Sequence, residues 1–255
     1  MVDYKFWLTK IENSIFWLYL NNPEKKNAFD PKVVNELDQI LEEEIKQNLN
    51  VIRVLVCTTS MNDIFTVGLD IKWLVTLDES KAKDMTRKLQ KIFGKFESIS
   101  IPVIMAIKGL NLTAGFELML CADIIIAADN ARFGQVETKW SMTPAAGATQ
   151  RLVRLVGPLK AREIIYTSRI IDAQEALKIG LVNEVVPLME LENRVEEMAR
   201  MMIQNSGRAI AFCKRLIQQG IYNNEHGFQM EGEVFHELFT SGEPKRKLKT
   251  FLGRK

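Results

Sequence analysis

Cysteine and histidine are scarce in this sequence of 255 residues, which contains three cysteines and two histidines. Cys57, Cys121 and Cys213 are odd in number and far apart, without the Cys-x-x-Cys spacing of a metal or redox motif. This pattern argues against a disulfide framework and favours a reducing compartment. Both histidines, His226 and His236, lie close to the C-terminus.

Long apolar runs and an excess of one charge are also missing. The longest apolar runs, such as residues 124–128, are far too short to span a bilayer. A formal net charge of +2 gives no general attraction to nucleic acid or to anionic membranes. Residues 1–5 show neither an apolar signal core nor an Arg-rich presequence. We therefore expect a cytoplasmic protein with no membrane partner, for which a nucleic-acid partner is not favoured.

Alternating strand and helix patterns predict an α/β fold. Segments rich in β-branched and aromatic residues predict strands over 4–10, 14–20, 51–57, 102–107 and 122–127. Apolar residues at helical spacing predict helices over 30–46 and 79–98, and another helix is expected to begin near residue 114. Asp30 is suited to cap the first helix, and Pro31 to occupy its first turn. The regular return of strand and helix indicates a core of parallel type.

The pattern becomes mainly helical after residue 158. Helices are predicted over 160–168, 172–179, 189–204, 207–219 and 224–240, with an extended segment over 180–187. We divide the chain into an α/β core over 1–190, which contains the site, and a helical region over 191–255. The second region is predicted to mediate oligomerisation.

Two glutamates, Glu117 and Glu137, each lie in a glycine-containing segment within loops that alternate with the predicted elements. The loops over 23–29 and 64–72, and the one containing Glu117, each follow a predicted strand and precede a helix, where open α/β sheets bind ligands. If the fold brings both glutamates into one dry cleft, they form an acid/base pair. Burial and like charge would separate their pKa values, so that one ionises while the other keeps its proton.

Five segments, in order, give the chain a resemblance to the crotonase superfamily of enoyl-CoA hydratases and isomerases. They are residues 21–29, 65–72, 102–123, 133–152 and 180–186, and the first resembles the pattern N-x-P-x-x-x-N-A-L. The resemblance extends nearly from end to end. It implies an α/β crotonase-like (ClpP/crotonase) spiral core of repeated strand-strand-helix units with a helical C-terminal region.

The resemblance also implies a site for an acyl-CoA substrate. The main-chain amides of Leu69 and Ala114 match an oxyanion hole that holds the thioester enolate. Glu117 matches the residue that activates water in hydratases, and Glu137 the residue that delivers a proton to Cα. The family chemistry implies no metal and no cofactor, since coenzyme A is part of the substrate.

Contacts with the rest of the substrate are implied less directly. Lys25 or Lys26, together with Lys72, would meet the CoA phosphates. Residues matching the strip beside the adenine and pantetheine are Ala28, Val67, Leu69, Asp70 and Ile71. Phe116, Trp140 and Met142 flank the glutamates and are expected to shape the acyl pocket. Similar proteins form homotrimers or hexamers, in which a lysine of the basic tail over 245–255 would reach a neighbouring subunit's CoA.

One departure from the family pattern concerns the oxyanion hole itself. The usual glycine triplet before the first glutamate is here Thr113-Ala114-Gly115. Alanine at position 114 is harmless if the residue begins a helix, and strained if its φ angle is positive.

The presence of both glutamates favours hydration of a 2-enoyl thioester, because isomerases of this fold often keep only the position of Glu137. Dienoyl isomerases have an aspartate where this chain has Ala145, and the histidines are poorly placed for a dehalogenase. Two alternatives stay open. One is a Δ3-Δ2 enoyl-CoA isomerase or a hydratase of an unusual cyclic or branched acyl-CoA. The other is a non-catalytic binding member that uses the basic tail to bind RNA.

Overall fold

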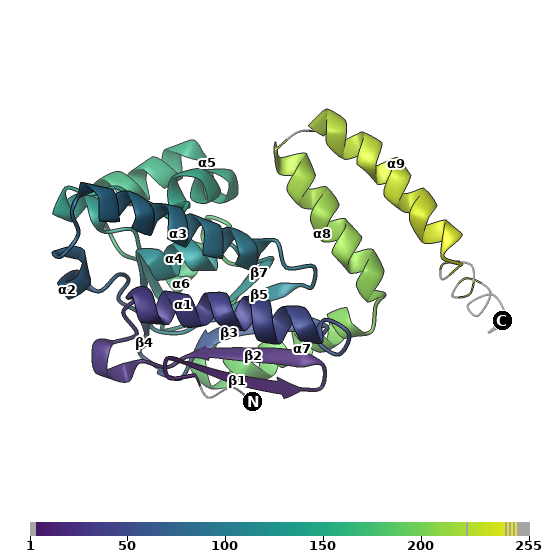
Figure 1. Cartoon of the computed structure of the whole chain (residues 1–255), viewed down its shortest axis with the longest axis horizontal. Helices are drawn as coiled ribbons and strands as arrows, with labels where there is room; N and C mark the ends of the chain where they lie inside the picture. Colours follow the sequence, from purple (N-terminus) through teal and green to yellow (C-terminus); the bar gives the residue numbers. More distant parts are fainter. Residues whose placement is uncertain (1–3, 223, 243, 245, 247, 249–255) are drawn as a thin grey trace. The chain divides into compact units, whose positions relative to one another are not determined.

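The computed structural model describes residues 4–222, 224–242, 244, 246 and 248 (Figure 1). The chain divides into two compact units, Met1–Ile203 and Gln204–Lys255. The division falls after Ile203 and not after residue 190, because helix α7 (Leu191–Ile203) packs on the main sheet of the first unit. The role of the second unit in oligomerisation stays a prediction.

The main sheet of the first unit has six strands in the order β1-β2-β3-β5-β7-β10. These are β1 (Trp7–Glu12), β2 (Ile15–Leu20), β3 (Val54–Thr59), β5 (Val103–Ile107), β7 (Ile124–Ala128) and β10 (Glu184–Val186). Strand β1 is antiparallel to β2, and every other neighbouring pair is parallel. The expected strands are confirmed, with ends displaced by a few residues, and β10 lies inside the predicted extended segment.

Alternate side chains of this sheet enter two separate cores. Phe16, Leu55 and Met105 belong to the larger core, which also includes residues of helices α1 (Pro31–Gln39) and α3 (Glu79–Glu97). Trp17 and Val56, their neighbours along the strands, belong to a second core beneath α7. Successive side chains of a strand point to opposite faces of the sheet, and both faces of this sheet are apolar. Both faces must therefore be shielded from water, and helices pack on each of them (Figure 1).

The first helix changes its pitch after nine residues. Asp30 caps α1 through Oδ1, which accepts from the main-chain amides of Lys32 at 2.9 Å and Val33 at 3.1 Å. The chain then continues as a π-helix, η2 (Ile40–Ile45), and a 3-10 turn, η3 (Lys46–Asn48). The helix predicted over 30–46 is confirmed in extent, and its change of pitch was not predicted.

A smaller second sheet was not predicted. Its order is β4-β6-β8-β9, formed by β4 (Ile64–Thr66), β6 (Leu110–Leu112), β8 (Arg132–Gly134) and β9 (Ile171–Asp172). Strands β4, β6 and β8 are parallel, and β9 is antiparallel to β8. The carboxyl ends of the three parallel strands therefore meet at one edge. The segments leaving that edge are 67–69, 113–114 and 135–137.

Short helices follow these segments. They are α2 (Ile71–Leu74), α4 (Ala114–Met119) and the 3-10 helix η4 (Glu137–Trp140), and η1 (Pro23–Lys25) precedes α1. Helix α5 (Ala148–Thr167) begins well before the predicted helix over 160–168, because Gly157 (φ 77°, ψ 162°) and Pro158 interrupt the helical pattern in its middle. Helix α6 (Ala173–Lys178) and the 3-10 turn η5 (Leu188–Glu190) complete this unit.

The second unit contains helices α8 (Gly207–Tyr222) and α9 (Asn224–Thr240), which pack against each other. Arg208 forms an ion pair with Glu237 at 2.8 Å across this hairpin. Of the basic tail over 245–255, nearly all lies outside the described residues, and so does the lysine expected to reach a neighbouring subunit. None of the helices in the described part of the chain combines the length and the apolar character that a bilayer crossing needs.

Candidate active site

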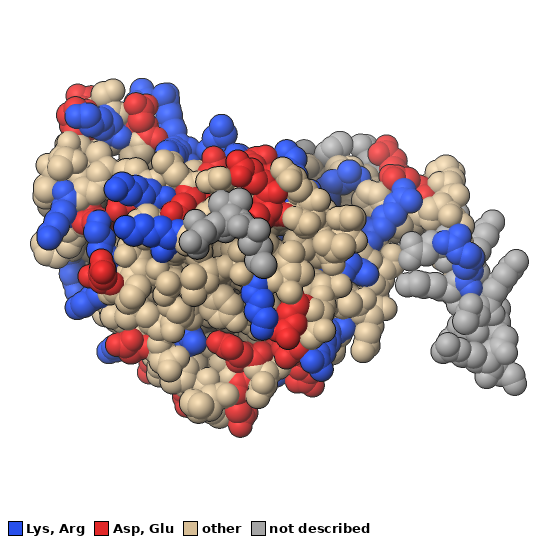
Figure 2. All heavy atoms as spheres, turned by 60° about the horizontal axis from the view of Figure 1, so that its bottom comes forward, with Lys and Arg blue, Asp and Glu red and all other residues tan. Residues whose placement is uncertain are grey.

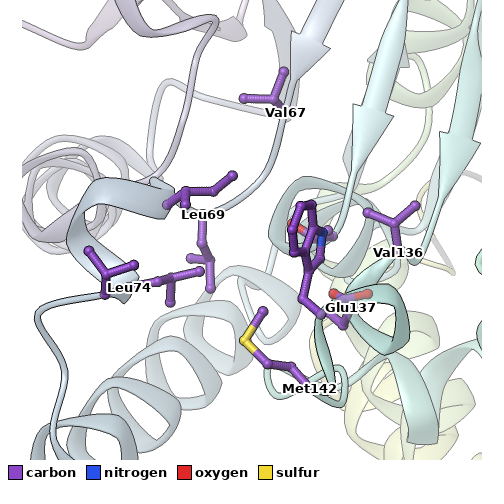
Figure 3. A pocket seen from close by; sticks show the side chains of 10 residues that line it. Val67, Leu69, Leu74, Val136, Glu137 and Met142 are labelled. Carbon is purple, nitrogen blue, oxygen red and sulfur yellow. The ribbon is translucent and has the colours of Figure 1, made fainter.

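A cavity of about 290 Å³ lies at the edge where the three parallel strands of the second sheet end. Its lining consists of Val67, Leu69, Ile71, Leu74, Val75, Thr113, Val136, Glu137, Trp140 and Met142. Glu137 is the single ionisable residue in this set. Figure 3 shows Leu69 and Leu74 on one side of the space, with Glu137 and Met142 on the other. The cavity thus offers apolar walls and one carboxyl group.

Glu137 is the first residue of η4 and lies three positions after Gly134, the last residue of β8. Only 8% of it is exposed, and burial raises its pKa from 4.5 to about 7, with the charge of Glu117 adding to the effect. The Gln135 amide is assigned with its nitrogen towards this carboxyl, since the opposite orientation would set oxygen against oxygen. It then donates to Oε1 at 2.7 Å and to Oε2 at 2.8 Å.

Glu117 lies in α4 and is buried, with 3% of its surface exposed. Its Oε1 accepts hydrogen bonds from the main-chain amides of Ala146 at 2.8 Å and Ala148 at 3.1 Å. Burial raises the pKa of this carboxyl, and the two amides oppose the rise. Its charge also adds to the rise in the pKa of Glu137, so the two predicted glutamates lie within electrostatic reach of each other.

The main-chain amides of Leu69 and Ala114, the two predicted oxyanion donors, lie in different local backbone arrangements. The main-chain amide of Phe29 donates to the carbonyl of Gly68 at 2.8 Å, and the carbonyl of Phe29 accepts from the amide of Asp70 at 2.8 Å. The amide of Leu69, which lies between Gly68 and Asp70 in the chain, therefore points away from Phe29. Ala114 begins α4, where an amide has no acceptor within the helix. Among the described residues, neither amide donates to another protein group.

Strain falls on Thr113 and not on Ala114. Ala114 begins a helix, whereas Thr113 has φ 47° and ψ −116°, a rare conformation for a β-branched residue. Such a backbone costs on the order of 1–3 kcal/mol. The hydrogen bonds from Thr113 N to Gly134 O at 3.0 Å and from Glu117 N to Thr113 O at 2.9 Å hold it in place.

A buried asparagine supports the segment that presents Leu69. The Asn27 side chain donates to Thr59 Oγ1 at 2.8 Å and to the carbonyl of Phe65 at 2.9 Å. The main-chain carbonyl of Asn27 accepts from Thr66 Oγ1 at 2.6 Å, and that hydroxyl accepts from the Gly68 amide at 2.9 Å. Sequence reasoning missed this role, although Asn27 belongs to the N-x-P-x-x-x-N-A-L pattern.

The residues predicted to contact CoA lie near the cavity with different surroundings. Lys25 Nζ is shared between Asp30 at 3.0 Å and Asp70 at 2.9 Å, so its charge is already engaged. Lys26 and Lys72 are exposed, and Ala28 is buried. Of the remaining predicted contacts, Val67, Leu69 and Ile71 line the cavity. The contact of these residues with CoA stays a prediction.

The three residues expected to shape the acyl pocket divide into two groups. Trp140 and Met142 line the cavity and are 65% and 40% exposed. Phe116 does not line it. The Phe116 ring is fully buried and meets Phe133 edge to face, with ring centroids 6.3 Å apart. Leu74, Val75 and Val136 line the cavity without having been predicted as pocket residues, because no motif marks them.

Comparison with known proteins gives one family and many relatives. The model of the enoyl-CoA hydratase/isomerase family matches residues 10–255. The crotonyl-CoA hydratase of Syntrophomonas wolfei is 33% identical over 245 residues, which cover 96% of this chain and 94% of that protein. The short-chain-enoyl-CoA hydratase of Clostridium acetobutylicum is also 33% identical, over 96% of this chain and 93% of its own.

Solved structures agree with this assignment at the level of the whole chain. The enoyl-CoA hydratase from Bacillus anthracis is similar with a TM-score of 0.91 and 31% identity, covering 98% of this chain and 97% of its own. DspI of Pseudomonas aeruginosa gives a TM-score of 0.93 at 28% identity, over 100% and 97%. These likenesses confirm the predicted crotonase-like fold.

Proposed function

Because the chain belongs to the enoyl-CoA hydratase/isomerase family, we propose that it adds water reversibly across the double bond of a 2-enoyl-CoA thioester. The observation that supports this most directly is the buried carboxyl of Glu137 in the wall of an apolar cavity, with Glu117 near enough for its charge to raise the pKa of Glu137. The names of the relatives, which include hydratases of crotonyl-CoA and of short-chain enoyl-CoA, support the same substrate class.

The amides of Leu69 and Ala114 would hold the thioester oxygen in this reaction. When water adds, the electrons of the double bond move towards that oxygen, which gains negative charge in the transition state. Amides fixed in a site of low polarity stabilise such charge by about 3–4 kcal/mol per donor. Support comes from the two N–H groups having no other acceptor among the described residues.

The two carboxyl groups would divide the proton transfers. Glu117, as the base, takes a proton from water while the water oxygen bonds to the β-carbon. Glu137, as the acid, gives its proton to the α-carbon, so that one molecule of water has been added. Glu117 then releases its extra proton to solvent, and Glu137 takes up a proton from solvent, so that both carboxyl groups return to their initial states. A pKa of about 7 for Glu137 supports this assignment, because the group is then partly protonated at neutral pH.

The proposed reaction needs only groups of the protein, the CoA thioester and one molecule of water. We also propose that the protein works as a cytoplasmic homotrimer or hexamer. Exposed apolar side chains on α5, including Leu155 and Leu159, support an assembly that covers them. On the face shown in Figure 2, Lys and Arg side chains are interspersed with Asp and Glu, which gives no broad basic surface there for nucleic acid.

One observation favours a second activity, the Δ3-Δ2 isomerisation of an enoyl-CoA. Glu137 lines the cavity, whereas Glu117 is not among the lining residues. A single carboxyl group that removes and returns a proton suffices for isomerisation. A 3-enoyl thioester with the same acyl length would separate the two activities, because isomerisation creates the conjugated absorbance that hydration removes.

The test of the proposed function is the hydration of crotonyl-CoA, followed by the loss of its ultraviolet absorbance. We expect Glu137→Gln to lower kcat by about 100-fold or more, since general acid catalysis typically contributes a factor of that order. Glu190→Gln provides a control, because Glu190 is exposed and remote in sequence from the site segments. Hydration at an unchanged rate in Glu137→Gln, or no hydration by the wild-type protein, would overturn the proposal.

A further inference from the structure

Thr113 has two features that its turn does not require. The first is the positive φ angle, which a glycine adopts without strain. The second is the Oγ1 hydroxyl, which is buried and has no hydrogen-bond partner in the described part of the chain. Buried polar atoms are nearly always paired, and an unpaired one calls for an explanation. Glycine would avoid both features, so the turn alone does not account for the threonine.

The position of this side chain relates it to the proposed oxyanion hole. Thr113 directly precedes Ala114, whose amide is one proposed donor. Its Oγ1 packs against Gly68, where an added Cβ would lie only 1.7 Å from that oxygen. Gly68 directly precedes Leu69, whose amide is the other proposed donor. The Thr113 side chain therefore packs against the residue that precedes one proposed donor, and Thr113 itself precedes the other.

A rotation about χ1 would turn the buried hydroxyl away from Gly68 and towards a bound ligand. Thr113 itself lines the cavity, and its side chain can occupy staggered rotamers that exchange Oγ1 with the methyl group. A hydroxyl both donates and accepts hydrogen bonds. Beside two amides that can only donate, the ligand atom able to use all three groups is an acceptor oxygen. In a CoA thioester at this place, the acceptor is the thioester oxygen.

We propose that the Thr113 hydroxyl donates a third hydrogen bond to the thioester oxygen of the bound acyl-CoA. This inference rests on the proposed function, and it makes Thr113 a catalytic residue of the same site. The oxygen is more negative in the enolate-like transition state than in the substrate, so the third donor stabilises the transition state more strongly. Its removal therefore lowers kcat more than it raises KM.

Two variants of the full chain separate the hydroxyl from the shape of the side chain. Thr113→Val keeps the branched shape and removes the hydroxyl, whereas Thr113→Ser keeps the hydroxyl and removes the methyl group. For crotonyl-CoA hydration we expect Thr113→Val to lose about 100-fold in kcat, as for loss of an oxyanion donor. We expect Thr113→Ser to stay within about threefold of the wild type. Equal rates for wild type, Ser and Val would overturn the proposal.

A spectroscopic measurement distinguishes this proposal from the proposed function. Butyryl-CoA labelled at the thioester carbonyl has no double bond to hydrate, so binding can be studied without turnover. We expect its carbonyl stretch to shift to lower frequency on binding to wild type and to Thr113→Ser, and to shift less on binding to Thr113→Val. If the Thr113→Val variant does not fold, Thr113→Ala is compared with Thr113→Ser instead. An identical shift in all variants would show a merely structural hydroxyl, even if wild type hydrates crotonyl-CoA. A failure of hydration with the expected shifts would overturn the reaction alone.

Discussion

Oε1 of Glu117 lies 2.8 Å from the main-chain nitrogen of Ala146, a hydrogen bond between two segments separated by 29 positions. A second bond joins the same oxygen to the amide of Ala148, the first residue of α5. The position of the carboxyl group is thus fixed by the loop that leads into α5. The same two amides favour its ionised form, against the effect of burial.

This arrangement predicts that Glu117→Gln separates catalysis from folding. The glutamine Oε1 can keep both hydrogen bonds, so we expect the free energy of unfolding to change by no more than about 1 kcal/mol. A neutral amide cannot take a proton from water, and kcat should fall by about 100-fold to 10,000-fold. Hydration assays and urea unfolding measure the two quantities. Wild-type hydration by this variant would refute the assignment of Glu117 as the base.

Glu137 predicts a pH dependence of stability. Its pKa is about 7 in the folded chain and 4.5 as the reference for the unfolded chain, so the folded state binds this proton more tightly. The associated stability is complete below pH 4.5 and is lost as pH rises to about 7, to a total of about 3 kcal/mol. The difference in unfolding free energy between wild type and Glu137→Gln should follow this course. A difference that does not vary between these pH values would contradict it.

Asn27→Ala should destabilise the fold strongly. The substitution removes the bonds that the Asn27 side chain donates to Thr59 Oγ1 and to the buried carbonyl of Phe65, and the bond that it accepts from the Asn22 amide at 2.6 Å. We expect a loss of about 2–4 kcal/mol in the free energy of unfolding, measured by urea denaturation. Lys26→Ala is the control, because Lys26 is an exposed neighbour in the same segment. Similar effects from Asn27→Ala and Lys26→Ala would show that the network contributes little.

Trp140→Ala should change substrate preference with little effect on stability. The indole lines the cavity and is 65% exposed, so its loss opens the wall without emptying the core. We expect kcat/KM for longer unbranched enoyl-CoA substrates to fall about tenfold relative to crotonyl-CoA, because a longer chain loses apolar contact. Phe116→Leu is the contrasting variant: Phe116 is buried against Phe133, so it should lower thermal stability first. An unchanged chain-length preference in Trp140→Ala would exclude this wall from acyl binding.

Thr113→Gly should make the protein more stable and a slower catalyst. Glycine adopts the φ angle of 47° without strain, although it adds entropy to the unfolded chain. We expect a net gain of about 1 kcal/mol in the free energy of unfolding, together with a loss of kcat as the hydroxyl disappears. Thermal melts and hydration rates check both. A variant that is less stable than wild type would show that the threonine side chain contributes more by packing than its backbone loses by strain.

The sequence was most informative where several signals agreed. Buried strands such as β3 and β5 have continuous apolar runs, and the two glutamates lie in segments rich in glycine and in family motifs. The strands β4, β6 and β8 escaped prediction because three residues are too few to establish a period. The loops that follow those strands were nevertheless recognised, since turn residues mark them.

Side-chain direction was harder to predict than segment position. Phe116 precedes Glu117 in α4, but successive side chains on a helix point about 100° apart, so the ring enters the core. The strain expected as one possibility at Ala114 lies one residue earlier, at Thr113. A single sequence does not show where a strand ends and a helix begins to within one residue, and that is the precision these positions require.

The separation of the two sheets has a consequence for how this protein can diverge. The six-stranded sheet and its helices contain most of the large buried side chains, whereas the cavity is formed by segments at the edge of the four-stranded sheet. Replacements at positions such as Val75 or Met142 alter the cavity wall without touching the interior of the six-stranded sheet. New substrate preferences can therefore arise through single replacements that the fold tolerates, and the acyl specificity of related chains should vary faster than their architecture.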